Sequence, residues 1–138
     1  MNGLFVFDAC ALIAFLNEEQ GSDIVADILN DALTGQVSTN IHKINLLEVY
    51  YDVLRRCGNT AADEMLETVT ESPINIINDI SDDVLKEAGR LKATYRVSIA
   101  DSVALAVASV FGGSLLTSDH HELDVVEKSE SIKFHWIR

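Results

Sequence analysis

Apolar residues along the chain fall into two kinds of segment, short continuous runs and longer stretches with helical periodicity, and the two kinds alternate. A short apolar run bounded by polar residues is typical of a buried strand, whereas apolar positions three and four apart indicate a helix packed on one side. The predicted strands are residues 4–7, 36–39, 74–77, 114–117 and 132–137. The predicted helices are residues 9–16, 22–33, 41–56, 60–70, 82–95, 98–112 and 119–128. Strands separated by helices imply right-handed crossovers, so the pattern predicts an α/β fold, a three-layer α/β/α sandwich around a mostly parallel sheet.

Length and composition favour one domain. The chain has 138 residues, 48% of them hydrophobic, so we expect a single domain over residues 1–138. No apolar run approaches the roughly 18 residues that span a bilayer, and no positively charged leader precedes the first strand, so we expect neither a membrane segment nor a signal peptide. Cys10 and Cys57 lie in apolar helical segments. A disulfide between them is one alternative, but reduced thiols that fill core space in a cytoplasmic protein are the favoured interpretation.

The charge balance leaves two interpretations open. Ten basic and 22 acidic residues give a net charge of −12, a field that repels polyanions such as RNA. An acidic protein unconnected with nucleic acid is one interpretation. The other is that part of the acid is concentrated in a site that binds divalent cations, and the positions of the carboxylates decide between them.

Two aspartates follow predicted strands. Asp8 comes directly after residues 4–7, and Asp119 comes two residues after the strand at 114–117. In an open parallel sheet, the carboxyl ends of the strands form the crevice where ligands bind. Each aspartate has an alternative role as the N-cap of the helix that it precedes, but two in one small domain favour a shared site.

Glu48 lies within a predicted inward face of the helix at 41–56. That apolar stripe consists of Ile44, Leu47, Tyr51 and Leu54. Glu48 is four residues after Ile44 and three before Tyr51, so it points along the same stripe. A carboxylate on a buried face is costly unless it is paired or binds metal, and an ion pair with an arginine is the alternative.

Asp101 begins an apolar helix. Ser98 and Asp101 have the spacing of a capping box, in which the acid satisfies the backbone N–H of the serine. The helix that follows is apolar on every face, so its first turn should be buried near the edge of the sheet. Capping and metal binding use separate oxygens and do not exclude each other.

Four acids on neighbouring elements suit a hard divalent cation. Mg²⁺ prefers oxygen ligands, and bound metal ions activate water and offset the charge that develops on a transferring phosphoryl group. The adjacent His120 and His121 point apart on a helix, so surface histidines are a better interpretation than a zinc site. A glycine-rich phosphate loop, a Cys-x-x-Cys motif and a serine nucleophile motif are all missing from the sequence.

The motifs around the four acids resemble those of PIN-domain nucleases. Residues 6–14 (VFDACALIA) resemble the family's first motif, a strand that ends in aspartate. Residues 45–49 (NLLEV) resemble the second, which carries a glutamate. Residues 98–106 (SIADSVALA) and 115–119 (LLTSD) match the third and fourth. The order and spacing agree over essentially the whole chain, and its size is most similar to that of the VapC-type toxin ribonucleases of toxin–antitoxin pairs.

The resemblance implies a Mg²⁺- or Mn²⁺-dependent endoribonuclease in which Asp8, Glu48, Asp101 and Asp119 are catalytic residues and metal ligands. It also implies a homodimer and a small antitoxin partner that inserts a segment near the acidic site. Thr117 or Ser118 could orient a carboxylate or a phosphate, although a plain role at the end of the strand is the alternative. A catalytically inactive PIN-like scaffold that binds a partner is the alternative function.

RNA would have to be bound by few cations. Arg90, Lys92 and Arg96 span under two helical turns beside the Asp101 segment and are candidate RNA contacts, with a solvated helix surface as the alternative. Two further enzyme or signalling classes place acids at strand ends. An aspartyl-phosphate phosphatase usually needs a second aspartate where this chain has Cys10. A phosphoacceptor receiver domain needs a lysine where this chain has Ser118 and Asp119.

Overall fold

One five-stranded parallel sheet organises the chain. We describe the protein from a computed structural model, which covers residues 3–138. The strands are β1 (Leu4–Phe7), β2 (Ser38–His42), β3 (Ile74–Ile77), β4 (Ser114–Thr117) and β5 (Lys133–Trp136). Their order in the sheet is β3-β2-β1-β4-β5, and every neighbouring pair is parallel. The prediction of a mostly parallel sheet is therefore confirmed.

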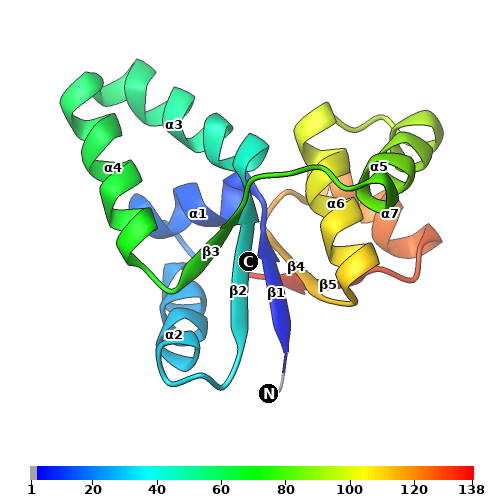
Figure 1. The fold of residues 1–138 in the computed structure, drawn as a ribbon, viewed down its shortest axis with the longest axis horizontal. Coiled ribbons are helices and arrows are strands. Elements are labelled where there is room, and N and C mark those ends of the chain that lie inside the picture. Colours follow the sequence, from blue (N-terminus) through cyan, green and yellow to red (C-terminus); the bar gives the residue numbers. More distant parts are fainter. Residues whose placement is uncertain (1–2) are drawn as a thin grey trace.

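Helices cover both faces of the sheet (Figure 1). One face carries α1 (Ala9–Leu16), α2 (Ser22–Leu33), α3 (Lys43–Cys57) and α4 (Asn59–Glu71). The other carries α5 (Asp82–Thr94), α6 (Ile99–Phe111) and α7 (His120–Ser129). Each face has its own hydrophobic cluster, because alternate residues of a strand point to opposite sides: Phe7 packs under the first group and Val6 under the second. This is the three-layer α/β/α sandwich that the sequence predicts.

The second strand lies two to three residues further along the chain than predicted. Residues 36–39 were the expected strand, whereas β2 runs over Ser38–His42 and the following helix starts at Lys43. Two polar residues of β2 are buried and form hydrogen bonds, so a search for runs of apolar residues does not detect the whole strand. The Thr39 hydroxyl donates to the Pro73 carbonyl at 3.1 Å, and the Asn40 amide donates to the Phe5 carbonyl at 3.3 Å.

The predicted inward stripe of α3 is wrong. Leu47 and Tyr51 are 61% and 60% exposed, and the fully buried residues are Asn45, Leu46, Val49 and Val53. The helix therefore turns a different face inward, although Ile44 and Leu54 of the predicted stripe are half-buried and pack against the core. The buried asparagine and the exposed leucine and tyrosine misled the pattern, since it assumed that apolar residues face inward. Glu48 is half-buried at the border of the two faces.

The expectations for cysteines and histidines are partly wrong. Cys10 and Cys57 are both free, as expected, but both are exposed and fill no core space. His120 and His121 are exposed as predicted, and His135 is exposed as well. His42 is buried instead. Its Nδ1 accepts a hydrogen bond from the Ile44 N–H and thereby caps α3. Over residues 3–138 no helix is long and apolar enough to cross a membrane.

Candidate functional site

The reversal of strand order places two aspartates side by side. The chain adds β2 and β3 on one side of β1 and β4 and β5 on the other, so the β1–β4 pair is the topological switch point of the sheet. Asp8 follows β1, and its N–H donates to the Leu116 carbonyl of β4 at 3.2 Å. Asp119 lies two residues after the end of β4. Both aspartates therefore sit at the edge where open α/β sheets bind ligands.

Asp8 is a buried carboxylate with one oxygen free. Its Oδ1 caps α1 by accepting the Ala11 N–H at 2.9 Å, whereas its Oδ2 has no hydrogen-bond partner. The residue is 1% exposed. Burial raises the pKa of Asp8 to about 7; the Thr117 hydroxyl and the Ala11 N–H lower it, and the charges of Asp101 and Asp119 raise it further. The capping role and a ligand role are thus divided between the two oxygens.

Thr117 positions the segment that carries Asp119. The Thr117 side chain is fully buried, and its Oγ1 accepts the Asp119 N–H at 3.0 Å. Asp119 caps α7 through Oδ1, which accepts the Glu122 N–H at 3.2 Å. Ser118 is half-buried between them. Of the two candidate supporting residues, Thr117 therefore has a defined structural contact with an acidic residue of the site.

Asp101 lies in the first turn of α6, as the capping box predicts. The Ser98 hydroxyl accepts the Asp101 N–H at 3.0 Å, and residues 102–108 of the helix are buried. Burial raises the pKa of Asp101, hydrogen bonding to Ser98 lowers it, and the charges of Asp119 and Glu122 raise it. Asp101 therefore lies within electrostatic reach of Asp119.

Glu48 reaches the same edge from α3. Burial raises its pKa, and the charge of Asp101 raises it further. The charges of Asp101 and Asp119 thus raise the pKa of Asp8, and the charge of Asp101 raises the pKa of Glu48, so the site links all four acids. All four come from different elements, and only the fold brings them near one another.

The carboxylates do not form a closed set of ligands. Within residues 3–138, no group of three or more His, Cys, Asp or Glu side chains is arranged closely enough to hold a metal ion. Without a cation, like charges at one edge repel one another and favour separation. The residues nevertheless fit a hard cation chemically, because Asp8 Oδ2 is a buried, unpaired carboxylate oxygen and such an atom is costly without a partner.

The three basic side chains that are candidates for RNA binding differ in their contacts within the protein. Arg90 forms ion pairs of 2.7 Å with both Glu87 and Glu130. The Lys92 ammonium donates to the Val97 carbonyl at 2.8 Å. Arg96 is exposed in the segment between α5 and α6, close in sequence to the Ser98 cap. Arg96 is therefore the most available of the three for a phosphate.

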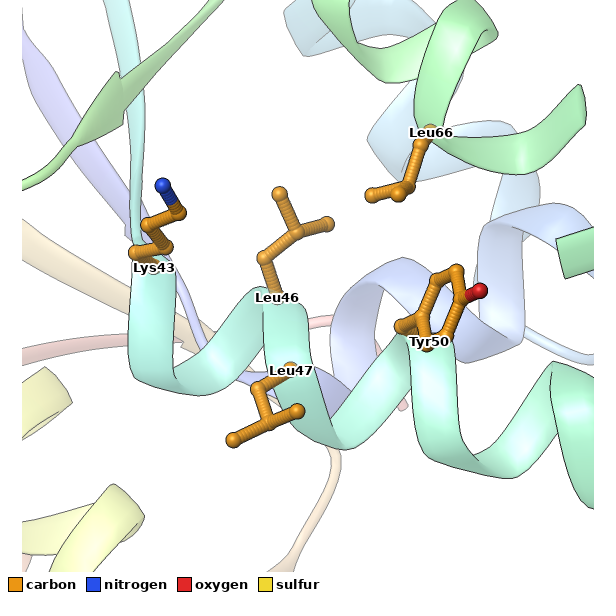
Figure 2. A pocket seen from close by; sticks show the side chains of 5 residues that line it. All are labelled: Lys43, Leu46, Leu47, Tyr50 and Leu66. Atoms are coloured by element: carbon orange, nitrogen blue, oxygen red, sulfur yellow. The ribbon is translucent and has the colours of Figure 1, made fainter. Parts of the chain in front are cut away.

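Two features near the acids were not predicted. One is Asn45, which is fully buried on α3 three residues before Glu48; its only sequence signal was its place at the start of the NLLEV motif. The other is an apolar hollow of about 190 Å³ between α3 and α4. Figure 2 shows Leu46 and Tyr50 of α3 turned toward Leu66 of α4.

A doubly wound sheet with acids from four elements near its switch point defines the protein as an α/β domain with a candidate cation site. The family model of the PIN domain matches residues 5–128. The chain belongs to the PIN domain family, which confirms the resemblance that the four motifs indicate. No protein with a curated description matches the sequence.

Solved structures of VapBC systems share the fold. A DNA-bound VapBC from Salmonella typhimurium has a TM-score of 0.73 at 15% identity, with 100% of both chains covered. VapBC-1 from nontypeable Haemophilus influenzae has a TM-score of 0.72 at 13% identity, with 97% of this chain and 98% of that chain covered. VapC20 from Mycobacterium tuberculosis, described as a toxin that cleaves the sarcin-ricin loop, has a TM-score of 0.61 at 17% identity, with 80% and 86% covered. At these identities the likeness shows a shared fold.

Proposed function

We propose that this protein is a Mg²⁺- or Mn²⁺-dependent endoribonuclease. The observation that carries the proposal is Asp8, a buried carboxylate at the switch point with one free oxygen and a pKa near 7, next to Asp101 and Asp119. Strongly perturbed carboxylates in a ligand-binding crevice are typical of functional sites. Membership of the PIN domain family and the fold shared with an RNA-cleaving toxin support the same activity.

Each acid has a distinct task in this proposal. Asp8, Glu48 and Asp101 hold the first cation, and Asp119 completes the site or helps to bind a second one. A bound divalent cation would supply Lewis-acid stabilisation of the phosphodiester and activation of water. Hydrolysis would add one water across the phosphodiester bond and leave a 5′-phosphate and a 3′-hydroxyl.

The environment of the acids sets the protonation of Asp8 and the orientation of Asp119. Asp8 must be ionised to bind a cation, so the proton that burial retains has to leave as the ion binds. Thr117 fixes the backbone of Asp119 through a 3.0 Å hydrogen bond and thereby limits where that carboxylate can point. Arg96 is the candidate contact for the RNA backbone, in a protein whose net charge of −12 otherwise disfavours RNA.

The activity is tested with purified protein, freed of any bound partner under denaturing conditions and refolded. Labelled structured RNA is incubated with the protein and Mn²⁺, and in parallel with EDTA. We expect endonucleolytic cleavage only in the presence of metal. RNA that stays intact while the protein binds no Mn²⁺ in calorimetry would contradict the proposal and favour a non-catalytic scaffold.

We further propose a small antitoxin partner, a homodimer and a cytoplasmic location, where such RNA is found. The VapBC structures that share the fold are toxin–antitoxin systems. The hollow formed by Leu46, Tyr50 and Leu66 could accept an apolar side chain, and the net charge favours a basic partner. Light scattering of the purified chain tests the dimer, and a mass of one chain at micromolar concentration would contradict it.

A further inference from the structure

Two buried residues carry polar atoms with no hydrogen-bond partner. Among the residues that the structure describes, the buried side-chain N and O atoms without a partner are Asp8 Oδ2, Asn45 Oδ1 and Asn45 Nδ2. Asn45 is 0% exposed and Asp8 is 1% exposed. Native proteins pair nearly all such atoms with protein or ordered water, so each exception needs an explanation.

The two residues occupy neighbouring positions at the carboxyl edge of the sheet. Phe7 of β1 pairs with Ile41 of β2, so the chain leaves the two strands side by side, into Asp8 on one and into α3 on the other. Asn45 lies in the first turn of α3, three residues after His42, which ends β2 and caps the helix. Both unpaired groups therefore follow adjacent strands at the carboxyl edge of the sheet.

The face of α3 that carries Asn45 packs into the hydrophobic cluster between α3, α1 and the end of β1. Asn45, Val49 and Val53 are four residues apart and share one helical face. Val49 and Val53 pack in the same buried cluster as Phe7 and Leu12, which flank Asp8 in β1 and α1. Packing alone does not account for an asparagine there, because an apolar side chain would fill the same face without unpaired polar atoms.

We propose that Asn45 is a positioning residue of the divalent-cation site, where its amide holds water from the hydration shell of an ion bound at Asp8. The inference rests on the proposed function. The amide oxygen accepts a hydrogen bond from the water, and the amide nitrogen donates to the free carboxylate oxygen or to a second water. Mg²⁺ and ions like it keep several waters in protein sites, so such a residue acts through the hydration shell and touches neither the ion nor the RNA.

Three variants distinguish this role from packing. Asn45→Leu replaces the amide by apolar groups on the same branched skeleton. Asn45→Ser keeps a hydrogen-bonding group with room for water, and Val49→Ala removes packing from the same face. The measurements are the Kd for Mn²⁺ by calorimetry at pH 8 and the unfolding temperature of the metal-free protein. We expect Asn45→Leu to weaken Mn²⁺ binding roughly 10–100-fold, as loss of an outer-sphere partner typically does, without lowering the unfolding temperature.

The controls should behave in the opposite way. Asn45→Ser should bind Mn²⁺ more tightly than Asn45→Leu, and Val49→Ala should lower the unfolding temperature while leaving the Kd unchanged. Wild-type affinity in Asn45→Leu overturns the inference and leaves the nuclease proposal intact. Absence of Mn²⁺ binding in the wild type overturns both. If Asn45→Leu does not fold, the Kd of Asn45→Ser decides, and affinity equal to or below that of an Asn45→Ala variant overturns the inference.

Discussion

The backbone N–H of Asp8 donates a hydrogen bond of 3.2 Å to the carbonyl of Leu116, which joins the end of β1 to β4. This contact extends the β1–β4 ladder by one residue beyond the strand and holds Asp8 beside the segment that leads to Asp119. The burial that follows from this position raises the pKa of Asp8 to about 7. The same contact therefore positions the Asp8 carboxylate at the edge of the sheet and buries it, so that its ionised form is disfavoured in the metal-free protein.

Replacing Asp8 by asparagine should stabilise the metal-free protein at pH 8. Asparagine keeps an N-cap oxygen for the Ala11 N–H but removes the buried charge. Because the folded pKa is raised from 3.8 to about 7, the contribution of Asp8 to stability is fully present below pH 4 or so and is lost as the pH rises through 7. The expected gain in the free energy of unfolding is on the order of 2–4 kcal/mol at pH 8. Urea unfolding at pH 5 and pH 8 measures it, and a variant less stable than the wild type at pH 8 would contradict the pKa assignment.

Cation binding should depend on pH in the range set by Asp8. Binding requires the ionised carboxylate, so below pH 7 each unit of pH should weaken Mn²⁺ binding by about tenfold for one proton released. Above pH 7 the dependence should become shallow. Calorimetry at pH 6, 7 and 8 in buffers of different ionisation enthalpy reports both the Kd and the proton count. Constant affinity from pH 6 to pH 8 would show that no carboxylate with a raised pKa takes part.

Thr117 should affect activity through Asp119 and, because its hydroxyl lowers the pKa of Asp8, through that carboxylate as well. Thr117→Val removes the acceptor for the Asp119 N–H at nearly constant volume, and we expect a loss of about 1 kcal/mol in stability together with slower RNA cleavage. Thr117→Ser restores the hydroxyl and should recover most of the rate. If the valine and serine variants cleave RNA equally fast, the hydroxyl has only the strand-end role considered from the sequence.

The basic residues near α6 should differ in their effect on RNA. Arg96→Glu should raise the KM for RNA, because it reverses the charge of an exposed side chain that, unlike Arg90, is not held in an ion pair with Glu87 and Glu130. Arg90→Gln breaks ion pairs with Glu87 and Glu130 at a half-exposed site, so we expect a stability loss within about 1 kcal/mol and a nearly unchanged KM. Steady-state cleavage at two salt concentrations separates the two variants. Equal shifts in KM would contradict the assignment of Arg96 as the RNA contact.

The positions of the aspartates at strand ends and helix starts are the part of the candidate site that the sequence predicted well. Asp8 and Asp119 follow short apolar runs whose boundaries are visible without a structure, and the capping box at Ser98 and Asp101 is a local signal. These features depend on neighbours within three or four residues of the chain. The sheet order, which makes β1 and β4 adjacent, depends on contacts between distant segments and could not be predicted from local patterns.

The buried face of α3 was not predictable in the same way. Hydrophobicity selected Leu47 and Tyr51, but tertiary packing buries Asn45 and Val49 instead. A polar residue on the inner face, as at Asn45, violates the rule on which the pattern depends. The buried His42 escaped prediction for a related reason, since its ring serves as a cap that no apolar pattern marks. The local pattern was thus least reliable where polar groups are buried beside the candidate site.

The most direct measurement compares cleavage of one labelled structured RNA by the wild type, Asp8→Asn and the matched control Asp27→Asn, under single-turnover conditions with Mn²⁺ and with EDTA. Asp27 is an exposed aspartate on α2, so its substitution changes the net charge equally but leaves the site intact. We expect metal-dependent cleavage by the wild type and Asp27→Asn, and none by a folded Asp8→Asn protein. Cleavage at the wild-type rate by Asp8→Asn would show that Asp8 is not a catalytic residue.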